Sequence, residues 1–197
     1  MDSLTPRLIL ASSSPRRKML LQQIGLTFDV LVSNIDERLD HDLPPERIAE
    51  QLAFEKAQAV AASCSNALVL GADTIVVDER HILGKPADAA DAYRMLAHLS
   101  GKTHQVITGL TLISTAHIPQ KILMRHETTD VKFAMLTPRD IERYIETGEP
   151  LDKAGAYGIQ GKGAMFVEWI HGCYNNVVGL PLYLLTRMLR EMSFHFE

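Results

Sequence analysis

A long apolar stretch near the middle of the chain places the tightest limit on the fold. Residues 67–72 form a nearly continuous apolar run, Asp73 and Thr74 interrupt it, and Ile75–Val77 resume it. Such a run is typical of a strand covered on both faces of a sheet. A carboxylate within it is costly to bury unless it meets a partner or a metal. Two interpretations stay open: a turn between two strands, which the nearby Gly71 favours, or a carboxylate presented at a strand end toward a cleft.

The segments on either side of this run alternate between strand and helix patterns. Further strands are expected at Leu8–Ala11, Phe28–Val32, Gln105–Ser114, Ile122–Met135 and Ala164–Ile170, and helices at Pro15–Ile24, Pro45–Ser63, between Lys85 and Gly101, between Thr137 and Gly148, and at Pro181–Met192. This alternation predicts an α/β fold, with a mixed sheet flanked by helices and two lobes around a central cleft. The third and fourth of these strands are expected to form a long antiparallel pair that extends the sheet. We expect one domain over residues 1–197.

The N-terminal strand leads into three serines, a proline and two adjacent arginines. Ser14 suits the N-cap of a helix and Pro15 its first position. Arg16 and Arg17 then stand at the positive end of the helix, where each cation is disfavoured by about 0.3–1 kcal/mol. Backbone amides, hydroxyls and guanidinium groups at a helix start are the parts of an anion site. The alternative is a solvated basic first turn, its cost offset by packing elsewhere.

A lysine lies on the apolar stripe of the helix expected at Pro45–Ser63. The stripe consists of Ile48, Ala49, Leu52, Ala53, Ala59 and Val60, and Lys56 falls midway between Leu52 and Val60. A lysine in this place usually extends to solvent, and the spacing alone favours that interpretation. The alternative is a lysine that points into a cleft and meets an anion there.

Other charged residues are candidates for phosphate or metal binding. Carboxylates that suit Mg²⁺ or Mn²⁺ are Asp36, Glu37, Asp40, Asp73 and Asp152. Cations that each have an unremarkable surface explanation, but together suit one polyphosphate, are Arg16, Arg17, Lys56, Lys85 and Lys153. The glycine-rich stretch DKAGAYGIQGKG lets the backbone approach a ligand closely, although such stretches are more often plain connections.

Charge and hydropathy exclude several classes of protein. The net charge of −4 and the pI near 6.1 argue against a nucleic-acid binder. No apolar segment approaches the roughly 18 residues of a membrane span. Cys64 and Cys173 form no CxxC pattern and suit a reducing compartment. We therefore expect a cytoplasmic protein without a membrane partner.

Seven motifs follow one another across nearly the whole chain: LILASSSPRRKMLL, FEKA, GADTIVV, GKP, SGKTHQVITGL, EPLDKAGAYGIQGKG and VVGLPL. Together they resemble the Maf family of nucleoside triphosphate pyrophosphatases. The resemblance implies a fold related to the inosine triphosphate pyrophosphatases, with two lobes around a cleft. It also implies a homodimer and metal-dependent cleavage of a nucleoside triphosphate to the monophosphate and pyrophosphate.

Within that family the chain resembles the dTTP/UTP branch, because Arg16, Thr74 and Gln160 stand where the 7-methyl-GTP branch tends to differ. The resemblance implies that Asp73 is the catalytic proton acceptor and that those three residues take part in substrate choice. It implies a polar lining made of Ser12, Arg17, Glu37, Lys56 and Lys85. A Mg²⁺ or Mn²⁺ ion held by Glu37 and Asp73 is the expected cofactor.

A second function from another class stays open. The family has also been linked with septum formation, so that a non-catalytic, nucleotide-binding regulator of cell division is the alternative to the enzyme. The set of carboxylates and cations favours the enzyme, since a binder does not need a metal-activated water.

Overall fold

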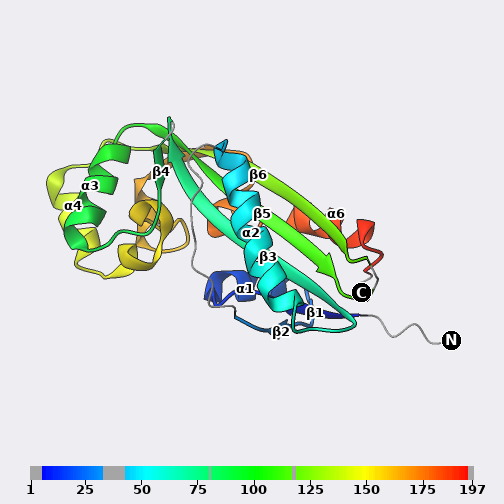
Figure 1. Ribbon diagram of the computed structural model, residues 1–197. Helices are drawn as coiled ribbons and strands as arrows, with labels where there is room; N and C mark the ends of the chain where they lie inside the picture. The colour runs from blue at the N-terminus through cyan, green and yellow to red at the C-terminus, as the bar shows by residue number, and fades with distance from the viewer. Residues whose placement is uncertain (1–5, 33–42, 80, 117–118, 195–197) are drawn as a thin grey trace. The chain divides into compact units, whose positions relative to one another are not determined.

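The structure is a computed structural model, and it describes residues 6–32, 43–79, 81–116 and 119–194. Within these residues the chain forms a mixed sheet flanked by helices (Figure 1). The strands are β1 (Arg7–Leu10), β2 (Asp29–Val30), β3 (Ala67–Asp78), β4 (His81–Leu83), β5 (Thr103–Ser114), β6 (Lys121–Phe133) and β7 (Val167–His171). Their order in the sheet is β2-β1-β3-β5-β6-β7, and β4 pairs with β3 outside this path.

Four of the helices in the described part of the chain lie between these strands, and two follow β7. They are α1 (Pro15–Gln23), α2 (Pro45–Ala61), α3 (Ala89–Leu99), α4 (Pro138–Ile145), α5 (Tyr174–Val178) and α6 (Leu182–Glu191), together with the 3₁₀ turns η1 (Glu149–Asp152), η2 (Ala154–Ala156) and η3 (Lys162–Phe166). Strand β1 pairs in parallel with β2 and β3, whereas β4 runs antiparallel to β3 and β7 antiparallel to β6. The predicted α/β class with a mixed sheet is confirmed.

Strand β3 runs without a break from Ala67 to Asp78. The interpretation of a turn between two strands is therefore wrong, and Asp73 lies within the strand rather than at its end. Every residue of β3 except Thr74 is buried, as expected for a strand covered on both faces.

The first helix begins as the sequence predicts. Ser14 is the N-cap of α1, and its hydroxyl accepts a hydrogen bond from the backbone amide of Arg17 at 3.4 Å. Pro15 occupies the first helical position. Gly25 follows the helix with φ of +73°, a left-handed conformation that glycine adopts without strain. This cap and proline fix where the first turn starts, and so where both arginines lie along it.

The chain divides into two compact units. Unit 1 comprises residues 1–73, 108–127 and 179–197, and unit 2 comprises residues 74–107 and 128–178. A cluster of buried residues in unit 1 consists of Ile9, Ala11, Ala57, Val60, Ala61, Ala67, Val69 and Ile113. The cluster in unit 2 includes Val76, Leu96, Leu99, Val131, Phe133, Ile141, Tyr144, Tyr157 and Phe166. Each unit thus has apolar packing of its own.

In unit 1, helix α2 packs closely on strands β3 and β5, along which it lies in Figure 1. A Cβ atom at Gly71 would lie 2.1 Å from the carbonyl oxygen of Ala53, and one at Gly109 would lie 2.1 Å from that of Ala49. The two glycines therefore let the helix backbone approach the sheet. The predicted apolar stripe of α2 needs one correction, because Ala59 is exposed and Ala57 is buried in its place.

Several short elements were not predicted, among them β4, α5 and the 3₁₀ turns. The strand expected at Ala164–Ile170 begins only at Val167, because Lys162–Phe166 form η3. Among the described residues, no helix is both long and apolar enough to cross a membrane.

Candidate active site

The carboxylate of Asp73 forms an ion pair with the ammonium of Lys56 in unit 1, from Oδ1 to Nζ. The two side chains are only 12% and 15% exposed. The interpretation in which Lys56 extends to solvent is therefore wrong, since this lysine meets an anion that belongs to the protein itself. The pair explains how a carboxylate is accommodated within an apolar strand, because its charge has a partner.

The register of two parallel strands places the serine turn and Asp73 toward the same end of the sheet. Leu10 of β1 lies opposite Leu70 of β3, and the amide of Ala11 donates to the carbonyl of Leu70 at 2.8 Å. Ser12 and Asp73 follow these paired residues by two and three positions. Both residues therefore lie beyond the carboxyl end of β1, the kind of position where α/β sheets bind ligands, although β3 itself continues to Asp78. The hydroxyls and the carboxylate thus belong to one edge of unit 1.

The guanidinium of Arg17 is held in a defined direction. Its Nη1 donates to the hydroxyl of Ser12 at 3.1 Å, and its Nε donates to the carbonyl of Gly179 at 3.0 Å. The same hydroxyl accepts from the backbone amide of Ser14 at 3.2 Å. A guanidinium and a serine hydroxyl therefore stand side by side at the start of α1, as an anion site requires. Arg16, on the same turn, is half-buried.

The remaining predicted residues lie in unit 2. Thr74 follows Asp73 directly in β3 and is half-buried, whereas Lys85 and Gln160 are exposed. The amide of Gly155 donates to the carbonyl of Gly84 at 3.0 Å, so that the Lys85 segment and the glycine-rich segment meet within this unit. Lys153, which the sequence offered as a further cation for phosphate, donates to the carbonyl of Glu149 at 2.7 Å and pairs with Asp152.

Glu37 lies outside the described residues, as do Asp36 and Asp40. Among the described residues no group of three His, Cys, Asp or Glu side chains is placed to hold a metal ion. Asp73 itself suits a hard cation: Lys56 engages Oδ1, and a carboxylate accepts through two oxygens. Mg²⁺ commonly uses one or two carboxylates and completes its coordination with substrate phosphates. The chemistry of Asp73 therefore fits the predicted metal.

A family model described as Maf-like protein matches residues 7–192. The chain belongs to the Maf family. A protein from Moorella thermoacetica named dTTP/UTP pyrophosphatase is 54% identical over 183 residues, which is 93% of each chain. Proteins of the same name from Symbiobacterium thermophilum and Bacillus cytotoxicus are 50% and 51% identical over 188 and 187 residues, and at least 95% of each chain is covered. These names are enzymatic, which favours the enzyme over the regulator.

One carboxylate that the sequence patterns did not indicate accepts several hydrogen bonds within unit 2 of this Maf chain. Glu149, at the start of η1, accepts hydrogen bonds from the hydroxyl of Tyr144 and from the backbone amides of Lys162 and Gly163. Burial raises the pKa of Glu149, but the hydrogen bonds from these three donors outweigh it, so that its pKa lies below the ordinary 4.5. Its place in the motif EPLDKAGAYGIQGKG was the only signal in the sequence.

A buried histidine was also missed. His104 is 2% exposed, and its Nε2 lies 2.8 Å from the hydroxyl oxygen of Tyr157, which lies within the glycine-rich stretch. Burial lowers the pKa of His104 to about 4, although the negative charge of Asp78 opposes the shift. Burial also raises the pKa of Tyr157. Both side chains are therefore neutral near pH 7, and they act as structural partners within unit 2.

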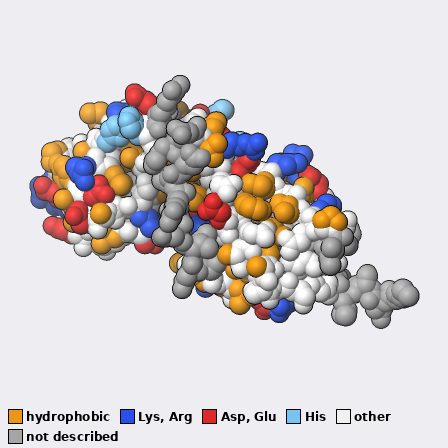
Figure 2. Space-filling view, viewed as in Figure 1, with side chains coloured by type: hydrophobic (Ala, Val, Ile, Leu, Met, Phe, Trp, Pro, Cys, Tyr) orange, Lys and Arg blue, Asp and Glu red, His pale blue; other side chains and the backbone are white. Residues whose placement is uncertain are grey.

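The surface of this Maf chain carries both signs of charge. On the face shown in Figure 2, the described Lys and Arg side chains are interspersed with Asp and Glu and with apolar residues. This mixed pattern differs from the basic stripe that a nucleic-acid-binding face carries.

Proposed function

We propose that this chain hydrolyses dTTP and UTP to the corresponding monophosphate and pyrophosphate. The observation that carries the proposal is the common edge of the parallel strands β1 and β3, toward which Ser12 and the Asp73–Lys56 pair lie. An anion-binding turn and a held carboxylate are the two parts that phosphoryl chemistry needs. Relatives with the name dTTP/UTP pyrophosphatase, similar over almost the whole chain, support the choice of substrate.

In the proposed reaction, Asp73 orients or deprotonates a water molecule that attacks the α-phosphorus in line. A bond forms between the water oxygen and this phosphorus, and the bond from the phosphorus to the oxygen that bridges to the β-phosphate breaks. Pyrophosphate leaves with the electron pair of that bond. Lys56 holds the carboxylate of Asp73 through its ion pair. Such a reaction depends mainly on positioning and electrostatics.

The triphosphate would bind to the serine turn and the cations. Ser12 and Arg17 are already hydrogen-bonded to each other, and a guanidinium with a neighbouring hydroxyl offers several donors to phosphate oxygens. Arg16 would contact the substrate from the same turn, and Lys56 and Lys85 would balance further negative charge. The helix start adds the partial positive charge of its backbone amides.

A divalent cation, Mg²⁺ or Mn²⁺, would be held by Asp73 and Glu37 together with the phosphates. When bound, it supplies charge stabilisation on the phosphate oxygens. The two carboxylates orient it, and Asp73 also faces the attacking water. This division of work is what a carboxylate with two acceptor oxygens can provide.

Selection of the base would fall to Thr74 and Gln160. The pyrimidine edge offers O2, N3 and O4, and an amide and a hydroxyl can both donate to and accept from such an edge. Gln160 is exposed on the glycine-rich loop, where its side chain has room to contact a ligand.

The proposal is tested by the release of pyrophosphate from dTTP, UTP, CTP and 7-methyl-GTP, each with and without Mn²⁺ or Mg²⁺. We expect turnover of dTTP and UTP, little turnover of 7-methyl-GTP, and dependence on the metal. No turnover of any of the four would contradict the enzyme and favour the regulator. Faster turnover of 7-methyl-GTP than of UTP would contradict the assignment to the pyrimidine branch.

We further propose a homodimer in the cytoplasm. Light scattering should then give a mass twice the 21.9 kDa of the chain, and a mass of one chain would contradict it. The cytoplasmic location is supported by Cys64 and Cys173, which are both free thiols.

A further inference from the structure

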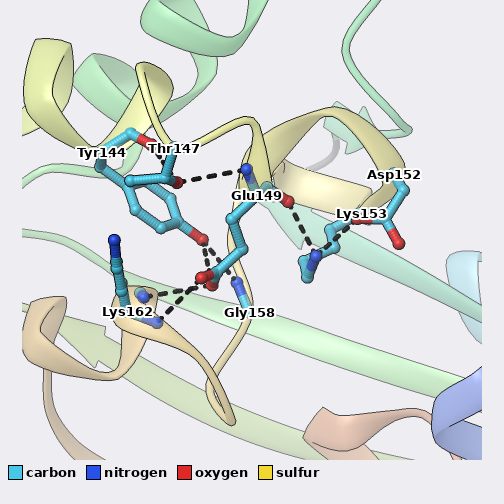
Figure 3. A network of polar contacts seen from close by, with 8 residues as sticks. Tyr144, Thr147, Glu149, Asp152, Lys153, Gly158 and Lys162 are labelled. Atoms are coloured by element: carbon cyan, nitrogen blue, oxygen red, sulfur yellow. Dashed lines mark hydrogen bonds and ion pairs between the residues drawn. The ribbon is translucent and has the colours of Figure 1, made fainter.

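The glycine-rich segment of unit 2 is folded around one carboxylate. Glu149 Oε1 accepts from the hydroxyl of Tyr144 at 2.8 Å and from the amide of Gly163 at 3.3 Å, and Oε2 accepts from the amide of Lys162 at 2.9 Å (Figure 3). Tyr144 in turn accepts from the amide of Gly158 at 3.1 Å. Through these bonds Glu149 reaches the backbone on both sides of the loop 158–163.

The glycines of this loop provide the room for Glu149. A Cβ atom at Gly161 would lie 2.3 Å from its Oε1, and a Cβ atom at Gly158 would lie 2.7 Å from Cε of Lys153 and 3.2 Å from the same Oε1. At Gly163 a Cβ atom would lie 2.8 Å from the hydroxyl oxygen of Tyr144. A side chain at Gly158 or Gly161 would displace the ends of the Lys153 and Glu149 side chains, and one at Gly163 would also meet the backbone oxygen of Gly158 at 2.9 Å, so glycine at these positions keeps Glu149 in its place.

One donor to Glu149, the hydroxyl of Tyr144, comes from the buried core of unit 2. Tyr144 is 3% exposed, and its ring packs edge-on against Phe166 with the centroids 5.0 Å apart. Tyr157, which precedes the loop 158–163, is hydrogen-bonded to His104 at 2.8 Å, and its ring packs edge-on against Phe133 with the centroids 4.7 Å apart. The loop is therefore anchored in the core at its start, and its end is bound to Glu149 through the amides of Lys162 and Gly163.

Gln160 is the exposed residue between these two sets of bonds. Gly158, two residues before Gln160, is linked to Glu149 through Tyr144. Gly161, the next residue after Gln160, lies in close contact with Glu149 itself. The position of the Gln160 backbone therefore depends on the carboxylate, and the residue itself is exposed. A change at Glu149 should reach a ligand through Gln160.

We propose that Glu149 is a positioning residue for nucleotide selection: it holds the loop 158–163 in the shape that presents Gln160, without touching the nucleotide itself. This inference rests on the proposed function, in which Gln160 contacts the base. It assigns the control of specificity to this hydrogen-bond network, and leaves the phosphate chemistry mainly to the residues of unit 1.

The test uses Glu149→Gln, which keeps the shape of the side chain but replaces one acceptor oxygen with a donor that opposes a backbone amide. Glu146→Gln is the matched control, since Glu146 is exposed three residues earlier. The readout is the ratio of kcat/KM for UTP to that for CTP, together with the separate kcat and KM values. We expect the ratio to fall on the order of tenfold in Glu149→Gln, as for the loss of a charge-assisted hydrogen bond, and to stay at the wild-type value in the control.

A double-mutant cycle with Gln160→Ala shows whether Glu149 acts through Gln160. In the Gln160→Ala background, Glu149→Gln should change the UTP-to-CTP ratio by less than about twofold, because the two changes act on one contact. A merely structural role predicts a lower melting temperature with an unchanged ratio, and that result would overturn the inference. An equal, additive effect in both backgrounds would overturn it as well.

If Glu149→Gln does not fold, Tyr144→Phe provides the same test. It keeps the buried ring but removes the hydroxyl that joins Gly158 to Glu149, and the ratio should fall in the same direction. The wild type separates the two failures. A wild type that hydrolyses none of the nucleotides refutes the proposed function and this inference together. A selective wild type whose selectivity survives both substitutions refutes only the inference.

Discussion

At the scale of single residues, the ion pair between Lys56 and Asp73 gives both side chains a partner that their sequence positions alone do not indicate. A lysine on an apolar stripe and an aspartate in an apolar strand are both costly alone. Together, at 15% and 12% exposure, each offsets the charge of the other. The pair also orients the carboxylate to which the proposed reaction assigns the water molecule.

Replacing Asp73 by Asn should lower the rate of pyrophosphate release about 10²–10⁴-fold, because an amide cannot accept the proton. The fold should survive with a loss of about 1–3 kcal/mol, since the ammonium of Lys56 loses its ionic partner. Turnover assays and urea unfolding measure the two effects. Asp29→Asn is the control: Asp29 is 61% exposed, and stability and turnover should both stay near wild type. Wild-type turnover in Asp73→Asn would contradict the role of Asp73.

His104 should make stability depend on pH. Its pKa is about 4 in the folded chain against an ordinary 6.5, so the unfolded chain takes up a proton first as the pH falls. The contribution of His104 to the free energy of unfolding is fully present above pH 6.5. It is lost as the pH falls from 6.5 to about 4, in total about 3 kcal/mol. We expect His104→Phe to be less stable at pH 7 but to lose less stability on acidification, measured by urea unfolding from pH 8 to 5.

The comparison for this prediction is His81→Gln, at an exposed position of β4. It should retain the wild-type slope of stability against pH. Equal slopes in wild type and His104→Phe would show that another group causes the acid loss.

At the scale of elements, the fit between α2 and the sheet determines whether Lys56 reaches Asp73. The helix backbone approaches β3 and β5 closely because Gly71 and Gly109 carry no Cβ. Lys56 lies three residues after Ala53, whose carbonyl oxygen faces Gly71. The packing of one helix on one strand and the geometry of the ion pair are therefore linked.

Gly71→Ala should be strongly destabilising for this reason. Its Cβ would lie 2.1 Å from the carbonyl oxygen of Ala53, and a backbone atom can yield only if α2 moves as a whole. We expect a loss of about 1–3 kcal/mol, as for other overpacked sites, and a fall in turnover because Lys56 moves with the helix. Gly84→Ala is the stability control, since a Cβ there meets nothing within 4 Å. Equal stability of the two variants would contradict close packing at Gly71.

At the scale of the whole molecule, the proposed site residues fall into both compact units. Ser12, Arg16, Arg17, Lys56 and Asp73 lie in unit 1, and Thr74, Lys85 and Gln160 lie in unit 2. The proposal assigns phosphate binding and the reacting water mainly to the first group, and choice of the base to the second. Substitutions should therefore separate into those that lower kcat for every nucleotide and those that change the ratio between nucleotides.

Removal of divalent metal should stop turnover while the chain stays folded. Mg²⁺ bound by one or two carboxylates depends on substrate phosphates for the rest of its coordination, so it contributes little to the free protein. We expect EDTA to abolish pyrophosphate release, Mg²⁺ or Mn²⁺ in excess to restore it, and the melting temperature to change by only a few degrees. Turnover that persists in EDTA would contradict the metal dependence.

Local patterns of residues were sufficient to locate most of the secondary structure. Apolar periodicity located the long strands and four of the helices, because burial of one or both faces imposes a fixed spacing on apolar residues. Ser14, Pro15 and Gly25 determined both ends of α1, since caps and a left-handed glycine act within a few residues. The motifs were enough to indicate the family and to name the candidate residues of the site.

The contacts of these residues, in contrast, depend on how the helices and strands pack together. No local pattern distinguishes a lysine that extends to solvent from one that meets Asp73, because their positions lie 17 residues apart along the chain and depend on how α2 packs on β3. The same is true of Glu149, because its donors Lys162 and Gly163 belong to a later loop of the chain. The environment of a charged group in a folded chain depends on its partners. Tertiary packing brings these partners together, and the spacing of residues along the sequence does not predict which of them meet.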